Sequence, residues 1–344
     1  MPGMLARLLL ALVLLLASPA RAAERLPALG ADGAAVTVSG VSSGAFMAVQ
    51  FHVAHSATVR GAGAIAGGPY DCAQGSLWTA LTSCMDPGPF SPLPDARRLA
   101  ELARGLAKAG GIDPVERLAG AKLWLFTGTR DDTVSSEVVE ALRRFYLALA
   151  PDADVAFENS VPAGHGMPTQ EEGNECSTTQ PPFIVDCAYD AAGILLAQLL
   201  GPLAAPTPKQ DGKLLEFDQR EFAGGNPAAI SMGDAGYVFV PDACAKERCR
   251  VHVVFHGCRQ SATQIDKRFV LEAGYNRWAA ANRLIVLYPQ TTPRWGYSFA
   301  SGNFVFNPKA CWDWWGYTGA RYAAKEGAQV RAVQAMLERL AQPR

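Results

Sequence analysis

The chain carries a serine between two glycines near its start. Gly40-Val41-Ser42-Ser43-Gly44 follows a β-branched run that begins at Val36, and an apolar stretch through Gln50 comes after it. This is the G-x-S-x-G pattern of a nucleophile on a sharp strand-to-helix turn, where the glycines let strand and helix pack closely. A helix that begins behind the serine offers N–H donors to an oxyanion. A Gly/Ser-rich turn without chemistry is the alternative, because the chain has 33 glycines.

A serine nucleophile needs a base and an acid that orients the base. Asp131 follows the apolar segment Lys122–Phe126 in a G-x-x-D-x-x-V pattern, with Asp132 as the fallback. His165 lies between glycines in the loop after the next predicted strand. An aspartate that caps a helix, a role that suits Asp132, and a surface-loop histidine are the alternatives. The order Ser, Asp, His, with each residue after its own strand, favours a catalytic triad.

The remaining histidines suit the role of base less well. His52 and His55 lie inside the helix predicted after Ser42, and His252 lies in the middle of a predicted strand.

An oxyanion hole needs two backbone N–H groups, and the residue after the nucleophile, Ser43, is expected to supply one. The second usually comes from a loop after a strand that precedes the nucleophile, but no such strand precedes Ser42. His256-Gly257-Cys258 has the usual form of that loop and follows the strand-like segment Arg250–Phe255 instead. This order predicts a circular permutation, in which the proline-rich segment 201–212 bridges the former termini.

Alternating strand-like and helix-like segments predict an α/β fold, a mostly parallel sheet with helices on both faces. The predicted parallel strands are Val36–Ser39, Ala62–Ala66, Lys122–Phe126, Ala153–Glu158, Arg250–Phe255 and Leu284–Tyr288, with Leu214–Phe222 and Gly236–Val240 at an antiparallel edge. The predicted helices are Ala45–His55, Ala96–Lys108, Ser135–Leu149, Asp190–Leu200, Glu272–Ala281 and Glu326–Leu340.

The first 22 residues have the pattern of a cleaved secretory signal: Arg7, the apolar run Leu8–Ala17 and the cleavage motif Ala20-Arg21-Ala22. Residues 23–344 are expected to form a single domain, and no later segment is long and apolar enough for a membrane span. The formal net charge of −1 gives no electrostatic reason to bind nucleic acid or an anionic membrane.

Eight cysteines in an exported chain predict disulfides. The short spacings suggest Cys72 with Cys84, Cys176 with Cys187 and Cys244 with Cys249, which leaves Cys258 and Cys311 for each other, although the sequence leaves the connectivity open. A metal site is the alternative. It is disfavoured because no C-x-x-C pair occurs and the histidines do not cluster near the cysteines, so no metal or cofactor is expected.

Residues 311–317, CWDWWGY, bring three tryptophans and one tyrosine together. Such side chains pack in cores and also bind flat or chain-like ligands, and both roles are expected here. A bridge from Cys311 to Cys258 would tie this segment to the His-Gly loop.

Taken together, these motifs resemble the catalytic domain of extracellular polyhydroxybutyrate depolymerases, and the late His-Gly loop resembles their circularly permuted type. The resemblance implies an α/β-hydrolase fold and cofactor-free ester cleavage in poly(3-hydroxybutyrate). It implies that Ser42 is the nucleophile, Asp131 the acid and His165 the base, with oxyanion donors at Ser43 and Cys258. The side chains expected to bind substrate are Trp312, Trp314, Trp315, Tyr317 and His256.

Many members of that family carry a further substrate-binding domain, and none is expected after the last predicted helix. Amorphous polymer or soluble oligomers are therefore easier substrates than crystalline polymer. The protein is expected to be a monomer in the periplasm or the medium. An esterase that acts on feruloyl or acetylxylan esters of plant cell walls is one alternative function, and a non-catalytic polymer-binding protein on a hydrolase scaffold is another.

Overall fold

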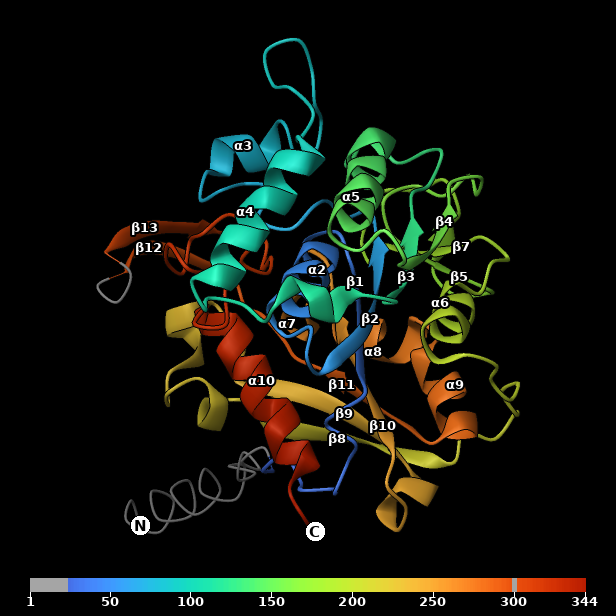
Figure 1. Cartoon of the computed structure of the whole chain (residues 1–344). Helices are drawn as coiled ribbons and strands as arrows, with labels where there is room; N and C mark the ends of the chain where they lie inside the picture. Colours follow the sequence, from blue (N-terminus) through green and yellow to red (C-terminus); the bar gives the residue numbers. More distant parts are fainter. Residues whose placement is uncertain (1–23, 299–301) are drawn as a thin grey trace, which may run out of the picture.

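The computed structural model describes residues 24–298 and 302–344, so the expected signal peptide lies outside the described residues. The centre of the fold is a twisted sheet with helices on both faces (Figure 1). In spatial order its strands are β4 (Asp154–Glu158), β3 (Lys122–Phe126), β2 (Val59–Ile65), β1 (Val36–Val41), β10 (Arg250–Phe255), β11 (Leu284–Tyr288), β9 (Ala235–Pro241) and β8 (Gly212–Asp218). From β4 to β11 all neighbours are parallel, and β9 runs antiparallel to both β11 and β8.

Successive side chains along each strand point to opposite faces of the sheet, so the hydrophobic core is divided between these two faces. In β3, Leu123 and Leu125 belong to one hydrophobic cluster, whereas Trp124 and Phe126 belong to another. The helices that cover the first face are α2 (Ser43–Ala54), α4 (Ala96–Lys108), α5 (Ser136–Leu149) and α10 (Ala328–Ala341), and those on the second face are α6 (Ala191–Leu200), α8 (Arg268–Glu272) and α9 (Tyr275–Asn282). The strands are apolar on both faces because helices cover both.

The chain order confirms the predicted circular permutation. The first described residues lie against the end of α10, where the amides of Leu29 and Ala31 donate to the Leu340 carbonyl at 3.1 and 2.9 Å. Joining α10 to β1 would restore a chain in which the His-Gly strand β10 precedes the serine strand β1. Residues 201–211 connect α6 to β8 without a helix or strand, and their role as the bridge between former termini stays a prediction.

The structure differs from the expected elements in several places. The helix expected at Glu272–Ala281 begins only at Tyr275, because Gly274 has a φ of 87° and separates it from α8. The strand expected through Phe222 ends at Asp218 and continues as a short 3₁₀ turn. A hairpin of β12 (Arg294–Ser298) and β13 (Asn303–Asn307) was not predicted.

The smaller elements form the edges of the molecule. They are α3 (Leu77–Leu81), α7 (Ala262–Ile265), the small sheet of β5 (Met167–Thr169), β7 (Ile184–Asp186) and β6 (Asn174–Glu175), and 3₁₀ turns at Val115–Leu118, Arg220–Phe222, Pro227–Ile230 and Asp242–Ala245. Among the described residues, a helix with the length and apolarity to cross a membrane is absent. Four disulfides join Cys72 to Cys84, Cys176 to Cys187, Cys244 to Cys249 and Cys258 to Cys311, the pairs that the spacing suggested.

Candidate active site

Ser42 lies on the sharp turn between β1 and α2. Its φ of 55° and ψ of −123° are unusual for a residue with a side chain and reverse the chain direction within one residue. The carbonyl of Ser42 accepts hydrogen bonds from the amides of Ala45 and Phe46 at 2.8 and 3.1 Å, which starts α2 directly behind the serine. Strained backbone of this kind concentrates at functional sites, where the surrounding structure maintains it.

The two glycines of the serine motif are required by close packing. A Cβ on Gly40 would lie 2.3 Å from the Gly44 carbonyl group. A Cβ on Gly44 would lie 2.2 Å from the Phe255 carbonyl oxygen, at the end of β10. Only hydrogen fits at either position, so this spacing lets α2 begin against the strand that carries the His-Gly loop.

We expect Gly44→Ala to lower the free energy of unfolding by about 3 kcal/mol, because the new methyl group would overlap backbone atoms that cannot move separately. Gly105 is the matched control. It lies exposed within α4 and a Cβ there would meet nothing within 4 Å, so Gly105→Ala is expected to stabilise by about 0.5–1 kcal/mol. Urea titrations followed by circular dichroism would measure both, and equal midpoints for the two variants would contradict the packing argument.

Asp131 and His165 form a hydrogen-bonded pair on adjacent loops. The Nδ1 atom of His165 lies 2.9 and 3.1 Å from the two carboxylate oxygens of Asp131. The Asp131 Oδ1 atom also accepts from the amides of Thr133 and Val134 at 2.9 and 3.0 Å, which fixes the carboxylate. Both side chains are almost fully buried, whereas Asp132 is exposed, so the structure brings Asp131 and not the fallback residue to the histidine.

The loops that carry the acid and the base are bonded to each other. The amide of Arg130 donates to the Ala163 carbonyl at 3.1 Å, and the amide of Thr129 donates to the Val161 carbonyl at 2.9 Å. The amide of His165 in turn donates to Thr179 Oγ1 at 3.0 Å. These contacts hold the imidazole at the ends of β3 and β4 and leave its Nε2 side for a second partner.

One cavity of about 430 Å³ brings Ser42 and His165 together. Ser42 lines it from the turn, His165 from one side, and Gly257 and Cys258 of the His-Gly loop (residues 256–260) from another. In the described chain, the amides of Ser43 and Cys258 donate to no other residue. Such an arrangement can carry out acyl transfer: a hydroxyl, an imidazole oriented by a carboxylate, and two amides available to a developing oxyanion.

The remaining wall of the cavity is largely apolar. Trp314 and Trp315 contribute to it from residues 311–317, which we call the Trp loop, and Trp314 stacks on Phe46 with ring centroids 4.1 Å apart. Side chains that the sequence did not single out complete the apolar wall: Leu77, Leu81, Met85, Pro181, Phe183 and Phe306. Apolar side chains at alternate positions of the hairpin segment were the only sequence signal for Phe306.

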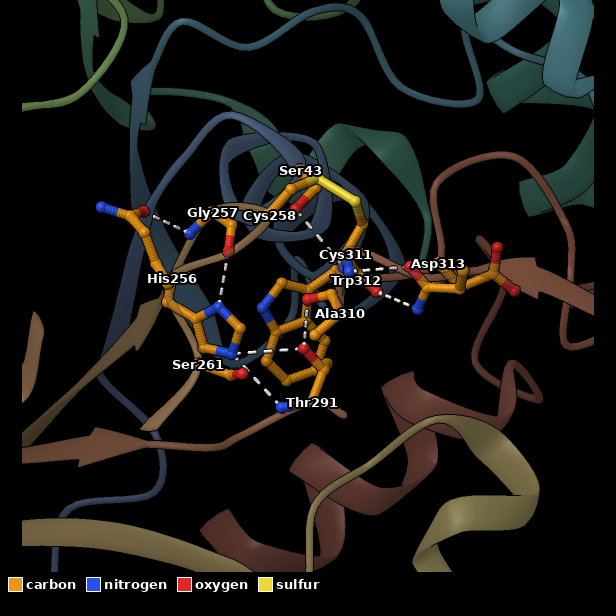
Figure 2. The surroundings of a disulfide bond; sticks show 12 residues. Ser43, His256, Gly257, Cys258, Ser261, Thr291, Ala310, Cys311, Trp312 and Asp313 are labelled. Carbon is orange, nitrogen blue, oxygen red and sulfur yellow. Dashed lines mark hydrogen bonds between the residues drawn. A yellow bond between two sulfur atoms is a disulfide. The ribbon is translucent and has the colours of Figure 1, made fainter. Parts of the chain in front are cut away.

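Asp313 organises the Trp loop from inside the protein. Its carboxylate accepts from the amides of Gly316, Tyr317 and Thr318 at 2.7–3.0 Å. Burial raises the pKa of Asp313, and these bonds, with one from the Thr318 hydroxyl, act in the opposite direction. The loop is anchored to the serine turn as well, because the Trp312 amide donates to Ser43 Oγ at 3.4 Å (Figure 2).

Three side chains expected at the substrate lie behind the cavity wall instead. Trp312 is fully buried and packs edge-on against Phe255, with centroids 5.0 Å apart. The Tyr317 hydroxyl donates to the Cys311 carbonyl at 2.8 Å and lies in the interior. His256 is fully buried beneath the His-Gly loop, and burial lowers its pKa to about 4. Trp314 and Trp315 alone of the five expected residues line the cavity.

The comparisons with known proteins agree with this geometry. A poly(3-hydroxybutyrate) depolymerase of Delftia acidovorans is 42% identical over 329 residues, which cover 93% of this chain and 62% of that protein. The chain therefore spans about three fifths of that relative's length. A polyhydroxybutyrate depolymerase of Talaromyces funiculosus is 36% identical over 328 residues, 93% of each chain. No protein-family model matches the chain.

Solved structures give the same result for the fold. The crystal structure of a PHB depolymerase from Penicillium funiculosum superposes with a TM-score of 0.81 and 32% sequence identity, over 92% of this chain and 98% of that one. A structure of a PHB depolymerase complexed with an R3HB trimer matches with the same values. The α/β-hydrolase architecture expected from the sequence is thereby confirmed.

Proposed function

The chain belongs to the polyhydroxybutyrate depolymerase family, and we propose on that basis that it is a serine esterase that hydrolyses poly(3-hydroxybutyrate) or its oligomers. The observation that carries the proposal is the cavity that Ser42 and His165 line together, with Asp131 hydrogen-bonded to the far side of the imidazole. Its apolar wall suits the methyl-bearing backbone of such a polyester.

In the proposed reaction, the Ser42 hydroxyl attacks an ester carbonyl while His165 Nε2 takes its proton. Asp131 accepts from Nδ1 and stabilises the imidazolium that forms. The amides of Ser43 and Cys258 donate to the tetrahedral oxyanion. Transfer of the proton from His165 to the leaving alkoxide releases a hydroxyl-ended fragment and leaves a 3-hydroxyacyl ester on Ser42. Water activated by His165 then hydrolyses that ester.

The side chains at the rim of the cavity suit a substrate that is a solid surface or a long chain. Hairpin strands β12 and β13 pair Trp295 with Phe306 and Tyr297 with Phe304, which puts four aromatic side chains on one face. All four are more than half exposed, whereas Val305 of the opposite face is fully buried. Phe306 also lines the cavity, so the aromatic face of the hairpin continues into the site. An exposed apolar patch of this kind marks a binding surface.

We expect the double variant Trp295→Ala/Phe304→Ala to adsorb about 30-fold more weakly to a poly(3-hydroxybutyrate) film, because each of the two rings contributes about 1 kcal/mol when it is partly buried on the polymer. Hydrolysis of soluble 4-nitrophenyl butyrate is expected to stay within about twofold. Leu271→Ala removes a comparably exposed apolar side chain from α8 and serves as the control. Equal adsorption of the double variant and the wild-type protein would contradict a role for the hairpin face.

Product analysis separates the proposed function from its alternatives. The purified protein is expected to clear a suspension of amorphous poly(3-hydroxybutyrate) and to release 3-hydroxybutyrate or its short oligomers. Release of ferulate or acetate from plant cell-wall esters, without clearing, would favour the carbohydrate esterase. Failure of a fluorophosphonate probe to label Ser42, with retained adsorption to polymer, would favour a non-catalytic binding protein.

We also propose that the protein is exported, that the signal ends at residue 22 and that residues 23–344 form one catalytic domain. The four disulfides support an oxidising compartment. The location in periplasm or medium and the monomeric state stay predictions.

A further inference from the structure

His256 is a buried histidine that the proposed chemistry does not use. It follows β10, and its ring lies beneath the His-Gly loop (Figure 2). Its Nδ1 atom is 2.7 Å from the carbonyl oxygen of Gly257. Its Nε2 atom is 3.2 Å from both the amide nitrogen and the hydroxyl of Thr291.

These contacts define which ring nitrogen carries the proton. The amide of Thr291 can only donate, so His256 Nε2 must accept and carries no proton. The proton is therefore on Nδ1, where it donates to the Gly257 carbonyl. The Thr291 hydroxyl donates to the Ala310 carbonyl at 2.6 Å, immediately before Cys311. Burial, which lowers the pKa of His256 to about 4, keeps the ring in this neutral form.

The hydrogen bond from His256 to the Gly257 carbonyl also affects the direction of the Cys258 amide at the proposed oxyanion site. The carbonyl of Gly257 and the amide of Cys258 belong to one peptide, which is trans. In a planar trans peptide the C=O and N–H bonds point in opposite directions. A donor that holds the carbonyl toward the interior therefore directs the Cys258 N–H toward the cavity.

We infer that His256 is a positioning residue, which orients the Cys258 amide for the oxyanion by holding the carbonyl of the same peptide. The inference rests on the proposed esterase function. Two other contacts restrain the loop around this peptide. Gln260 Oε1 accepts from the Gly257 amide at 2.7 Å, and the Cys258–Cys311 disulfide fixes the following side chain. The Gln260 amide also donates to the Gly257 carbonyl, at 3.3 Å, so the 2.7 Å bond from His256 is the shorter of the two that hold it.

His256→Leu and His256→Asn test the inference on 4-nitrophenyl butyrate. Leucine removes the donor, so kcat is expected to fall about 10–100-fold while KM stays within about twofold, since loss of a whole oxyanion donor costs about 10²–10³ in kcat. Asparagine can place its amide nitrogen near the position of Nδ1 and is expected to recover most of that loss. The inhibition constant of an alkyl trifluoromethyl ketone, which Ser42 converts to a tetrahedral oxyanion, should rise by the same factor as kcat/KM falls.

A His256→Leu enzyme with wild-type kcat would overturn the inference, and so would a lower kcat with an unchanged inhibition constant. His52→Leu is the control, because His52 is equally buried but, within residues 24–298 and 302–344, bonds only the Tyr146 hydroxyl. It is expected to change the melting temperature and to leave the inhibition constant unchanged.

A measurement on the unmodified protein covers the case in which leucine prevents folding. Nitrogen-15 NMR of histidine-labelled wild-type protein, with His256→Asn for assignment, should show a proton on Nδ1 of His256 and none on Nε2. The opposite tautomer would overturn the inference about His256 and would leave the proposed esterase function intact. Esterase activity on the nitrophenyl ester without hydrolysis of poly(3-hydroxybutyrate) would count against the proposed substrate and would leave the inference about His256 intact.

Discussion

Ser42→Ala is expected to lower kcat for 4-nitrophenyl butyrate by on the order of 10⁶, as removal of the nucleophile does in other serine hydrolases. Alanine leaves the backbone of the turn in place, so both candidate oxyanion amides keep their positions. Substrate would still bind in the cavity, and a residual rate of about 10³–10⁴ over the uncatalysed reaction would remain. KM and the melting temperature should therefore change little while turnover nearly disappears.

Stopped-flow measurement of the nitrophenolate burst would check this result, since in the proposed mechanism the acyl-enzyme forms on Ser42. Ser160→Ala is the matched control, because Ser160 is an exposed serine whose hydroxyl bonds Glu158, away from the cavity. A Ser42→Ala enzyme that retains a burst would show that another residue is the nucleophile. Loss of a fluorophosphonate label in Ser42→Ala, with full labelling of Ser160→Ala, would support the assignment independently of turnover.

The sequence predicted the parts of the site that depend on the order of elements. Ser42, Asp131 and His165 each follow a parallel strand, and the carboxyl ends of parallel strands meet at one edge of a sheet. Their convergence therefore required only the correct identification of β1, β3 and β4. The circular permutation was predictable for a related reason, since a His-Gly loop after the triad has to come from a strand adjacent to β1.

Side-chain direction was much less predictable than strand order. His256 and Trp312 have residue types that suit ligand contact, but the bond to Gly257 turns one inward and packing on Phe255 turns the other inward. In an irregular loop no periodicity relates one side chain to the next, so residue type says what a group can do and not where it points. The buried carboxylate of Asp313, which accepts from three amides of the Trp loop, has no signal of its own in the sequence.

The unpredicted hairpin shows a second limit. In β12 and β13 the aromatic residues occupy alternate positions, with Gly296 and Val305 between them, and here the aromatic face is the exposed one. A pattern rule assigns the apolar face to the core. The rule fails where the apolar face is exposed, as it is at Trp295 and Phe304, and we propose that such a face binds substrate.

Asp131→Asn is expected to lower kcat about 10⁴-fold at neutral pH. The Oδ1 position of Asp131 accepts from the amides of Thr133 and Val134, so the asparagine oxygen must occupy it. The side-chain NH₂ group then takes the Oδ2 position, 2.9 Å from His165 Nδ1, and donates to it. This bond requires the imidazole proton on Nε2. The histidine is then held in the tautomer that cannot accept the proton of Ser42.

Asp132→Asn gives the comparison that identifies the acid, because it makes the same chemical change one residue away on an exposed side chain. Its kcat is expected to stay within about twofold of the wild-type value, since Asp132 does not bond His165 and charge at an exposed site is well screened. Steady-state kinetics of the two variants on 4-nitrophenyl butyrate would measure the difference. A large loss in Asp132→Asn with activity retained in Asp131→Asn would transfer the role to Asp132 and would mean that the loop rearranges when substrate binds. Equal losses would indicate that the loop's total charge, and not one oriented carboxylate, supports the base.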